Sequence, residues 1–240
     1  MLCSVLHYST STIVIDTRSY KTLLKAGFKN VFNIPNPLGA ETVKLANSIL
    51  EKKLERKPGR LIFVGHIIKS KGVYDLVEAC SQLLSVEELL LIGPYRQVIK
   101  DELVKIGSTR ESGNWLKFTG ELADDKVLEF MFSSYVLALP SYTEGFPNVV
   151  LEAMTMGCAV IATDVGAIPE MLDLHSPEPC GICISPHIVD LLKDAISELF
   201  GDLNLAKIMG RNGIARVSKY YSNKIVVEQY RNIWESALNR

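Results

Sequence analysis

The chain has 240 residues, of which 48% are hydrophobic and 22% are charged, and its formal net charge is −1. This length suits one large or two small globular domains with a full hydrophobic core. The near-neutral charge excludes the basic surface that is typical of nucleic-acid-binding proteins. No apolar run approaches the ~18 residues of a transmembrane helix, and the N-terminal residues lack the features of a signal peptide. We therefore expect a cytoplasmic protein, peripheral to a membrane only through a partner.

The first 57 residues predict one β–α–β unit followed by a linker. IVID (13–16) and VFNIPNP (31–37) have the composition of strands, and residues 17–27 between them have a helical pattern. Residues 41–57 predict a charged connecting helix. Because three elements are too few for an independent domain, we expect residues 1–57 to be the remnant of a larger N-terminal domain plus a linker.

Residues 58–218 alternate short apolar runs with amphipathic stretches. The expected strands are LIFVG (61–65), LLLIG (89–93), LKFTG (116–120), YVLALP (135–140), AVIAT (159–163) and GICIS (181–185). The expected helices are VYDLVEACSQLL, VIKDELVKI, DDKVLEFMF, PNVVLEAMTM and IVDLLKDAISELF. Such apolar runs are typical of strands buried on both faces, and the alternation predicts a parallel sheet covered by helices. The expected fold class is α/β, with a doubly wound, Rossmann-like sheet.

The last part of the chain predicts two helices with polar faces over residues 203–238. A break is expected near residues 220–223. We treat residues 219–240 as a separate C-terminal helix.

Five cysteines are scattered along the chain: Cys3, Cys80, Cys158, Cys180 and Cys183. An odd, scattered set does not predict a disulfide framework. Cys180 and Cys183 have the spacing of a redox or zinc motif, but no second CxxC or histidine pair completes a zinc site. A thioredoxin-like motif opens a helix, whereas this pair enters a predicted strand, so we interpret both as packing residues.

The loop after the first long apolar run carries cationic side chains. His66, Lys69 and Lys71 lie beside Gly72, which opens a predicted helix. In an open parallel sheet, ligands bind at the carboxyl ends of the strands, and lysines at a helix N-terminus favour a phosphate. The loop fails the P-loop pattern because Ser70 stands in place of the second glycine. The alternative is a solvated loop with surface lysines.

Two other loops carry weaker signals. Gly93 allows close approach of a backbone, although a strand-ending turn explains it equally well. Asp124 and Asp125 begin a predicted helix. Carboxylates in that position more often cap the helix and interact with its dipole than bind a metal. We therefore predict no divalent metal site.

The segment EGFPNVVLE (144–152) has two interpretations. Gly145 frees the backbone, Pro147 suits the first turn of a helix, and the free amides of that turn favour an anion. Glu152 falls among apolar residues, where a carboxylate without partners is unfavourable. Glu144 and Glu152 could therefore hold hydroxyl groups at the two ends of a nucleotide sugar. Alternatively, Glu144 caps an ordinary helix and Glu152 is solvated.

Together these segments resemble the donor-binding half of retaining GT-B glycosyltransferases, in particular glycosyltransferase family 4, or glycosyl transferases group 1. The matching pieces are FVGHIIKSKGVYDLVEA, LLLIG, FTGEL, LALPSYTEGFPNVVLEAMTMGCAVIATDVGAIPE and GICISP, within about residues 31–238. The resemblance implies one half of a GT-B fold. It also implies a retaining transferase of the hexosyltransferase type, which moves a sugar from a nucleotide donor to a hydroxyl acceptor in cell-surface polysaccharide or lipopolysaccharide assembly.

The resemblance implies roles for individual residues. Lys71 would hold the diphosphate, His66 would stand where the family has an arginine, and Glu144 would contact the donor sugar as the third member of this catalytic set. Glu152 would hold the ribose hydroxyls, and the backbone of residues 120–122 would lie beside the nucleobase. The implied donor-binding residues are Gly65, Gly93, Gly120, Glu121, Leu122, Gly145, Phe146, Pro147, Asn148 and Glu152.

The resemblance further implies which molecules the protein meets. These are a nucleotide-sugar donor, a carbohydrate or lipid-linked acceptor and a separate acceptor-domain subunit, with no nucleic acid. No cofactor or metal is implied, because cations and a helix dipole stabilise the leaving diphosphate.

The chain departs from the family in its N-terminal part. Family members carry an N-terminal acceptor domain, and only residues 13–37 resemble its last helix and strand. The C-terminal helix normally crosses to that domain, so we expect Val226, Val227, Tyr230 and Trp234 to be uncovered. The two functional hypotheses are a glycosyltransferase that an acceptor subunit completes and a non-catalytic nucleotide-sugar-binding remnant. A redox enzyme fits poorly, because no GxGxxG follows the first strands.

Overall fold

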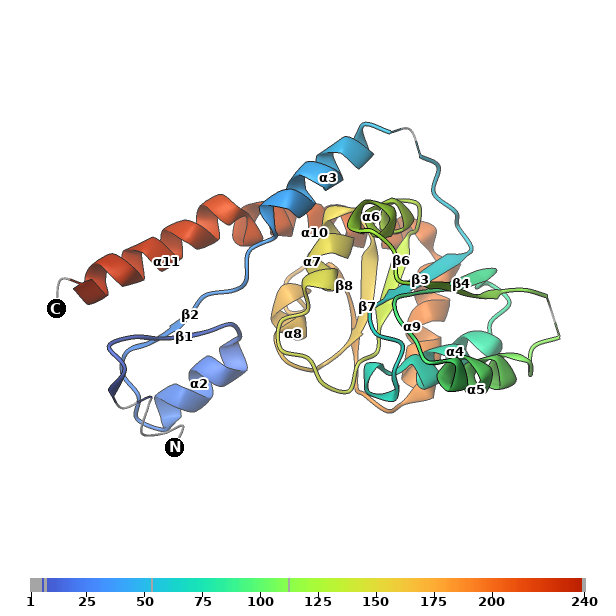
Figure 1. Ribbon diagram of the computed structural model, residues 1–240, viewed down its shortest axis with the longest axis horizontal. Helices are drawn as coiled ribbons and strands as arrows, with labels where there is room; N and C mark the ends of the chain where they lie inside the picture. The colour runs from blue at the N-terminus through green and yellow to red at the C-terminus, as the bar shows by residue number, and fades with distance from the viewer. Residues whose placement is uncertain (1–5, 7, 53, 112, 239–240) are drawn as a thin grey trace.

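The computed structural model describes residue 6 and residues 8–52, 54–111 and 113–238. Within these residues the chain forms a six-stranded α/β domain and a small N-terminal β–α–β unit. Two segments connect them: the stretch that contains α3 (Ala40–Leu50) and the C-terminal helix α11 (Asn223–Leu238). The N-terminal unit lies beside the α/β domain, along the side of α11 (Figure 1).

The sheet of the α/β domain is parallel throughout, with the strand order β5-β4-β3-β6-β7-β8. Its strands are β3 (Arg60–Val64), β4 (Glu88–Ile92), β5 (Leu116–Gly120), β6 (Val136–Leu139), β7 (Ala159–Thr163) and β8 (Gly181–Ile184). Every residue of β6 and β7 is buried, as expected for strands covered on both faces. The order reverses between β3 and β6, which is the arrangement of a doubly wound fold. The expected α/β, Rossmann-like fold class is therefore confirmed.

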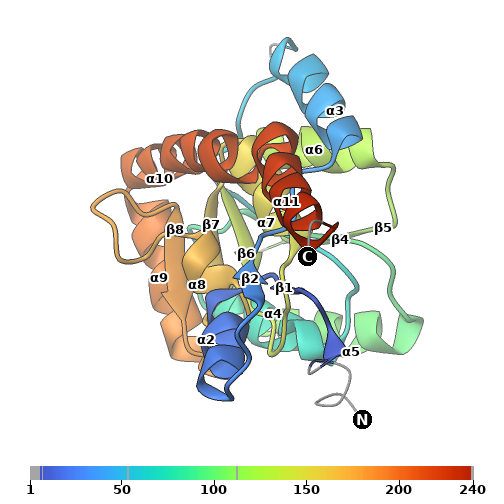
Figure 2. The ribbon, with the colours of Figure 1, turned by 90° about the vertical axis from the view of Figure 1, so that its left-hand side faces the viewer.

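Helices cover both faces of this sheet. Helix α4 packs between α5 and α9 on one face, whereas α6, α7 and α10 cover the other and α3 packs on α6 (Figure 2). Their bounds are α4 (Val73–Ser81), α5 (Gln97–Gly107), α6 (Asp124–Phe132), α7 (Asn148–Thr155), α8 (Ile168–Met171), α9 (Val189–Gly201) and α10 (Leu203–Arg216). The four-residue helix α8 was not predicted from the sequence.

The N-terminal unit is built from short elements. Strands β1 (Thr12–Val14) and β2 (Val31–Asn33) pair in parallel, and α2 (Thr17–Lys25) connects them. Asp16 caps α2 by accepting a hydrogen bond from the Ser19 amide at 2.7 Å. All residues of α2 are described, and none of them is buried. The unit therefore depends on contacts from outside for its stability.

Two connecting elements are shorter than the sequence predicts. The strand expected over 31–37 ends at Asn33, because Pro35 and Pro37 have no amide to donate to a ladder. The helix expected over 41–57 ends at Leu50.

Arg56, in the segment after α3, contacts main-chain oxygens of the α/β domain. The Arg56 guanidinium donates to the main-chain oxygens of Ser134, Met156 and Gly157 at 2.9, 2.6 and 2.8 Å. These contacts satisfy carbonyls just after α6 and at the C-terminal end of α7.

The predicted break between the last two helices is confirmed. Helix α10 continues into a short π-helix, η2 (Val217–Tyr221), and α11 begins at Asn223. From this point α11 runs over to the N-terminal unit (Figure 1).

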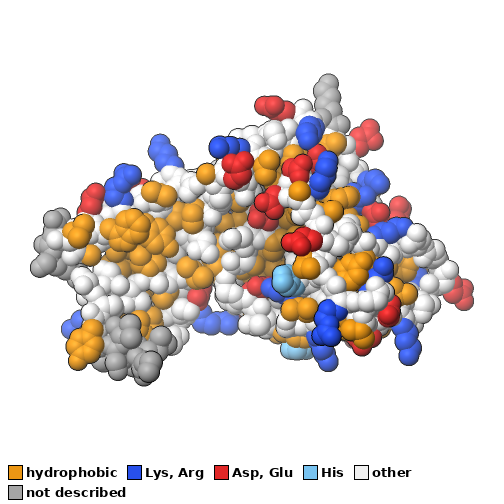
Figure 3. Space-filling view, in the orientation of Figure 1, with side chains coloured by type: hydrophobic (Ala, Val, Ile, Leu, Met, Phe, Trp, Pro, Cys, Tyr) orange, Lys and Arg blue, Asp and Glu red, His pale blue; other side chains and the backbone are white. Residues whose placement is uncertain are grey.

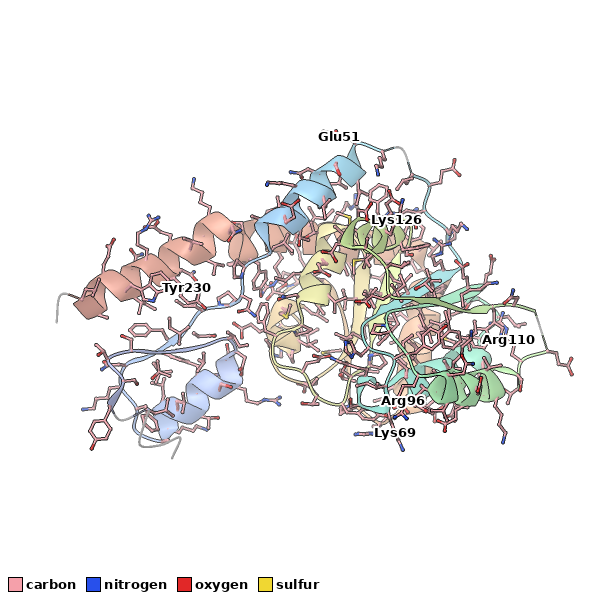
Figure 4. The ribbon with its side chains drawn as sticks, in the orientation of Figure 1. Glu51, Lys69, Arg96, Arg110, Lys126 and Tyr230 are labelled. Atoms are coloured by element: carbon pink, nitrogen blue, oxygen red, sulfur yellow. The ribbon has the colours of Figure 1, made fainter. Side chains whose placement is uncertain are left out.

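The prediction of an uncovered face on α11 is wrong for two of its four residues. Val226 is fully buried against Ile34, and Tyr230 packs on the same small cluster, beneath α11 on the side of β1 and β2 (Figure 4). Val227 and Trp234 remain 47% and 61% exposed. Hydrophobic side chains gather on the surface in the region of α11 (Figure 3). The N-terminal unit covers one apolar stripe of the helix and leaves the neighbouring stripe open.

Candidate functional site

The loops that follow β3 and β6 meet at the point where the strand order reverses. The Tyr142 amide donates to the Ser70 oxygen at 2.9 Å, which ties the two loops together. Gly72 lies so close to β6 that a Cβ atom there would be 2.0 Å from the Pro140 oxygen, and its φ is +68°. Only glycine fits both this approach and this conformation. The loops are thus held in close contact at the place where doubly wound folds bind ligands.

An ion pair joins these two loops. Lys71 Nζ lies 2.6 Å from Glu144 Oε1, and the two side chains are 29% and 10% exposed. Both residues were predicted to belong to the site, but their contact with each other was not. An ammonium group held at a sheet edge by a carboxylate is positioned for a phosphate. A phosphate would compete with Glu144 for the ammonium and leave the carboxylate able to accept from hydroxyl groups.

Helix α7 directs its N-terminus toward this ion pair from the β6 side. Pro147, where the helix was predicted to begin, is the N-cap residue of α7, which begins one position later at Asn148. The Phe146 ring packs edge-to-face on Tyr221, with ring centroids 5.9 Å apart, so its side chain anchors the loop. Asn148 is exposed at the first helical position. The first-turn amides of a helix lack intrahelical acceptors and carry partial positive charge, which favours an anion.

The loop after β7 supports the Glu144 loop from behind. The Ala167 amide donates to the Gly145 oxygen at 2.8 Å. A Cβ atom on Gly166, whose φ is +56°, would lie 2.3 Å from the same oxygen and 2.4 Å from the Glu144 oxygen. The sequence reasoning did not name Gly166 as a site residue. The only signal in the sequence was a glycine three positions after the end of an apolar run.

Three predicted glycines lie at the carboxyl ends of β3, β4 and β5. Gly65 donates to the Ile92 oxygen, and Gly93 donates to the Gly120 oxygen, both at 2.9 Å. A Cβ atom on Gly93 would lie 2.1 Å from the Gly65 oxygen. The close approach expected at Gly93 is therefore an approach to the neighbouring strand end. These hydrogen bonds align the three strand ends along one edge of the sheet.

The remaining residues expected near a nucleobase follow this edge. The Glu121 side chain is exposed, whereas Leu122 is half-buried and packs on the core. Gly120 has a φ of +73°, and a Cβ atom there would meet nothing within 4 Å. Open space therefore lies beside Gly120 at the end of β5.

Glu152 lies on α7 among buried apolar residues, as the sequence indicates. Burial raises the pKa of its carboxyl above the ordinary value of 4.5, and the nearby charge of Asp124 raises it further. Among the residues that the structure describes, none donates a hydrogen bond to this carboxyl. A half-buried carboxyl without donors is unfavourable when ionised. It is therefore ready to accept hydrogen bonds from a ligand.

Further cations lie along the same edge of the sheet. The His66 side chain is exposed after β3. The Ile67 amide donates to the Pro94 oxygen at 3.0 Å, which draws the loops after β3 and β4 together. As a result, Lys69 and Arg96 both lie at the lower edge of the domain (Figure 4). Lys69 and Arg96 add positive charge at the edge of the sheet that also carries Lys71.

Tyr142 is a residue of this site that sequence reasoning missed. Its hydroxyl lies 3.1 Å from both carboxylate oxygens of Asp75, and its ring lies over His187 with a centroid distance of 3.7 Å. Burial and the Asp75 hydrogen bond raise the pKa of Tyr142 to about 12. His187 has a φ of +63°, a conformation that non-glycine residues rarely adopt. Tyr142 thus links the loops after β3, β6 and β8.

The structure also bears on metals, thiols and membranes. Within residues 8–52, 54–111 and 113–238, no three His, Cys, Asp or Glu side chains are placed to hold a metal ion together. Cys183 lies within β8 and Cys180 is buried just before it, as the packing interpretation predicts. Burial raises the pKa of Cys180 to about 11 and that of Cys183 to about 12. None of the helices in the described part of the chain combines the length and apolarity of a membrane span.

Comparisons with known proteins agree with this geometry. Residues 46–216 match the model of the family described as glycosyl transferases group 1. The chain is 28% identical over 136 residues, 57% of its length and 31% of the relative's, to the putative teichuronic acid biosynthesis glycosyltransferase TuaC of Bacillus subtilis.

Two solved structures show the same fold. The C-terminal domain of LpcC, a glycosyl transferase group 1 family protein from Francisella tularensis, matches with a TM-score of 0.63 and 26% identity, covering 74% of this chain and 93% of that one. HepE from Anabaena in complex with UDP matches with a TM-score of 0.79 and 19% identity, covering 96% of this chain and 65% of that one. Among the curated relatives compared, the chain spans between 31% and 59% of their length.

Proposed function

The chain belongs to the glycosyl transferases group 1 family, and from this premise we propose that it binds a nucleotide sugar at the switch point between β3 and β6. It would serve as the donor-binding part of a retaining glycosyltransferase that acts on a hydroxyl acceptor. The observation that carries this proposal is the ion pair of Lys71 and Glu144, which lies beside the N-terminus of α7.

The diphosphate is assigned to Lys71 and the first-turn amides of α7. A nucleotide-sugar donor leaves as a diphosphate, so negative charge grows on that group as the glycosidic bond breaks. A fixed ammonium and a helix N-terminus stabilise such charge without rearrangement. His66 stands where the resemblance predicts an arginine, and a histidine contributes charge only when it is protonated. Transfer therefore relies more on Lys71 here than it would beside a permanently charged guanidinium.

Glu152 is assigned to the ribose hydroxyls and Glu144 to the donor sugar. The Glu152 carboxyl receives no hydrogen bond from the described residues, and hydroxyl groups would supply the missing donors. Glu144 already accepts from Lys71, and its second oxygen can accept from a sugar hydroxyl. The open backbone edge at Gly120 is left for the nucleobase.

The wider activity is proposed by likeness to relatives. The TuaC name refers to teichuronic acid biosynthesis, which supports a role in the assembly of cell-surface polysaccharide. HepE was solved with UDP, which supports a nucleoside diphosphate as the ligand class. We propose a carbohydrate or lipid-linked acceptor, held by a separate acceptor domain that faces the N-terminal unit.

Isothermal titration calorimetry with UDP, GDP and ADP at low salt tests the donor site. We expect one of the three to bind, and Lys71→Ala to weaken its binding at least about tenfold through loss of a charge-assisted contact. Lys69→Ala is the matched control, because Lys69 is exposed two positions earlier, and it should weaken binding less than about threefold. Failure of all three nucleotides to bind would refute the site assignment.

Transfer itself needs a second measurement. The chain is incubated with the corresponding nucleotide sugar and candidate acceptors, with and without a separately expressed acceptor domain, and any product is examined by NMR. We expect the product to keep the anomeric configuration of the donor. An inverted product would contradict the proposed reaction, whatever the nucleotide affinity.

A further inference from the structure

The N-terminal unit is attached to the α/β domain by a cluster of hydrogen bonds on Glu170. Oε2 of Glu170 accepts from the Thr17 amide at 3.0 Å and from the Thr17 hydroxyl at 2.6 Å. Asn33 Nδ2 lies 3.1 Å from the Thr17 hydroxyl oxygen and 3.4 Å from Glu170 Oε1. Thr17 begins α2, Asn33 ends β2, and Glu170 belongs to α8. We call these three residues the Glu170 clasp.

Two further contacts place the N-terminal unit over the Glu144 loop. Arg18 pairs with Asp164 at 3.2 Å, just after the end of β7. The Ile15 Cδ1 atom lies 3.9 Å from the position that a Cβ atom on Gly145 would take. The carboxyl end of β1 therefore faces the residue next to Glu144. In the proposed function this is where the donor sugar lies.

The unit is also attached through an apolar cluster. Ile34, Val226 and Ile233 form a small buried cluster between the end of β2 and α11. Apolar contacts of this kind stabilise without fixing direction, whereas a carboxylate that accepts from an amide and a hydroxyl does fix it. The cluster therefore acts as a pivot, and the Glu170 clasp sets the angle of the unit about it.

The clasp is also connected to the donor loop through the backbone. Glu170 lies three residues after Ala167, whose amide donates to the Gly145 oxygen at 2.8 Å. The segment that carries Glu170 thus supports the Glu144 loop from behind and holds the N-terminal unit in front of it. Residues 167–170 therefore position both the Glu144 loop and the N-terminal unit, which lie on the two sides of the space beside Gly145.

We propose that Glu170 is a positioning residue that holds the N-terminal unit as a wall against the sugar of the bound donor. The wall, with Ile15 nearest to Gly145, contacts the sugar and leaves the nucleotide untouched. This inference rests on the proposed function. Its consequence is that the clasp contributes to the affinity for a nucleotide sugar but not to the affinity for the nucleoside diphosphate alone.

Calorimetry on Glu170 variants tests this separation. The probes are the nucleoside diphosphate that binds in the calorimetry described above and the corresponding nucleotide sugar, in which glucose is esterified to the terminal phosphate. Below, this nucleotide sugar is called the ester. Glu170→Ala should weaken binding of the ester at least about fivefold and change binding of the diphosphate less than about twofold. Glu170→Gln should restore most of the ester affinity, because its amide oxygen still accepts from Thr17.

Two controls keep the result interpretable. Glu178→Ala changes an exposed glutamate in the same part of the chain and should leave both affinities unchanged. Thr17→Val removes only the hydroxyl of the clasp, so it tests the same contact if Glu170→Ala fails to fold. Hydrogen exchange of the Thr17 amide should rise in Glu170→Ala and remain slow in Glu178→Ala.

Several outcomes would overturn the inference. Equal loss of affinity for both probes would mean that Glu170 supports the donor loop and not a sugar wall. Equal binding of both probes by the wild-type chain would mean that no wall touches the sugar. Complete failure to bind any diphosphate refutes the proposed function instead, so the two failures are distinguishable.

Discussion

The chain contains the same β–α–β pattern in two settings, and the two differ in what stabilises them. In the α/β domain each inner strand has a strand on either side and helices on both faces, and β6 and β7 are completely buried. In the described part of the N-terminal unit, two strands of three residues pair only with each other, and α2, which is described throughout, buries none of its residues. The same local pattern thus produces a core in one setting and a dependent unit in the other.

A corresponding difference exists between two glutamates. Glu152 lies inside the α/β domain, and within the described residues its carboxyl receives no donor, so burial raises its pKa. Glu170 lies at the surface between the regions and accepts from both the amide and the hydroxyl of Thr17. The α/β domain thus contains a carboxyl, on Glu152, that lacks hydrogen-bond donors among the described residues at the proposed ligand site. The N-terminal unit is instead held in place by a carboxyl, on Glu170, that has its donors. Four predictions test this comparison, from the largest expected effect to the smallest.

The largest effect is expected in the centre of the sheet. Leu137→Ala removes a fully buried side chain from β6 and should lower the free energy of unfolding by about 2–5 kcal/mol, measured by urea denaturation. Leu84→Ala, at a side chain that is 75% exposed, is the control and should change it by less than about 0.5 kcal/mol. A loss below about 1 kcal/mol for Leu137→Ala would contradict a continuous, well-packed core.

A smaller and local effect is expected in the N-terminal unit. Ile34→Ala empties the small cluster with Val226 and Ile233. Hydrogen exchange at β1 and β2 should speed up strongly, while the urea midpoint of the α/β domain shifts little, because the unit opens separately. Equal acceleration across β6 and β7 would show that the two regions unfold together, and the distinction between them would then be lost.

The third prediction concerns Glu152 and how its carboxyl, which lacks hydrogen-bond donors in the described part of the chain, makes the stability of the protein depend on pH. Because burial raises the folded-state pKa of Glu152 above 4.5, ionisation is harder in the folded chain than in the unfolded chain. The resulting penalty is absent below the unfolded pKa, grows as the pH rises through the interval up to the folded pKa, and stays constant above it. Glu152→Gln should therefore stabilise the ligand-free protein by about 1 kcal/mol near pH 8 and have little effect near pH 4.

Thermal denaturation at a series of pH values measures this difference. The control is Glu78→Gln, which changes an exposed glutamate on α4 and should show no such pH dependence. The same Glu152→Gln variant should weaken nucleotide binding, because the amide no longer attracts hydroxyl groups as a carboxylate does. A variant that is less stable than the wild type at pH 8 would show that Glu152 has a structural partner.

The smallest effect is expected at Tyr142. Tyr142→Phe removes the hydroxyl that donates to Asp75 but keeps the ring over His187 and the amide that donates to Ser70. It should cost about 0.5 kcal/mol of unfolding free energy, the low end for a part-buried hydrogen bond, and weaken nucleotide binding only slightly. Tyr142→Ala, which also removes the ring, should weaken binding more. Identical behaviour of the two variants would assign all of the effect to the hydroxyl.

The fold could be predicted well from the sequence because its signals are local. All six strands of the sheet and the helices between them coincide with predicted runs to within a few residues, with α8 as the exception. An apolar run bounded by glycine or proline carries its own structural information. The one β–α–β unit at the N-terminus and the break before α11 were predicted for the same reason.

For the candidate site, the sequence indicated which residues lie at one edge of the sheet but not how they contact one another. Lys71 and Glu144 were placed at one edge because both follow strands of a parallel sheet. Their direct pairing, the support from Gly166 and the hydroxyl contact of Tyr142 were not predicted. These contacts depend on loop conformations, which the hydrophobic pattern does not describe.

The sequence by itself determined the approximate positions of the strands and of all the helices except α8, which loops carry basic residues, and which helix follows Glu144. Each of these follows from side chains within a few residues of one another. Only the tertiary structure decided that Val226 would be covered, that Lys71 would pair with Glu144, and that Glu170 would hold Thr17 from 153 positions away. Such contacts depend on the strand order and on how separate units pack, so they exist only after the whole chain has folded.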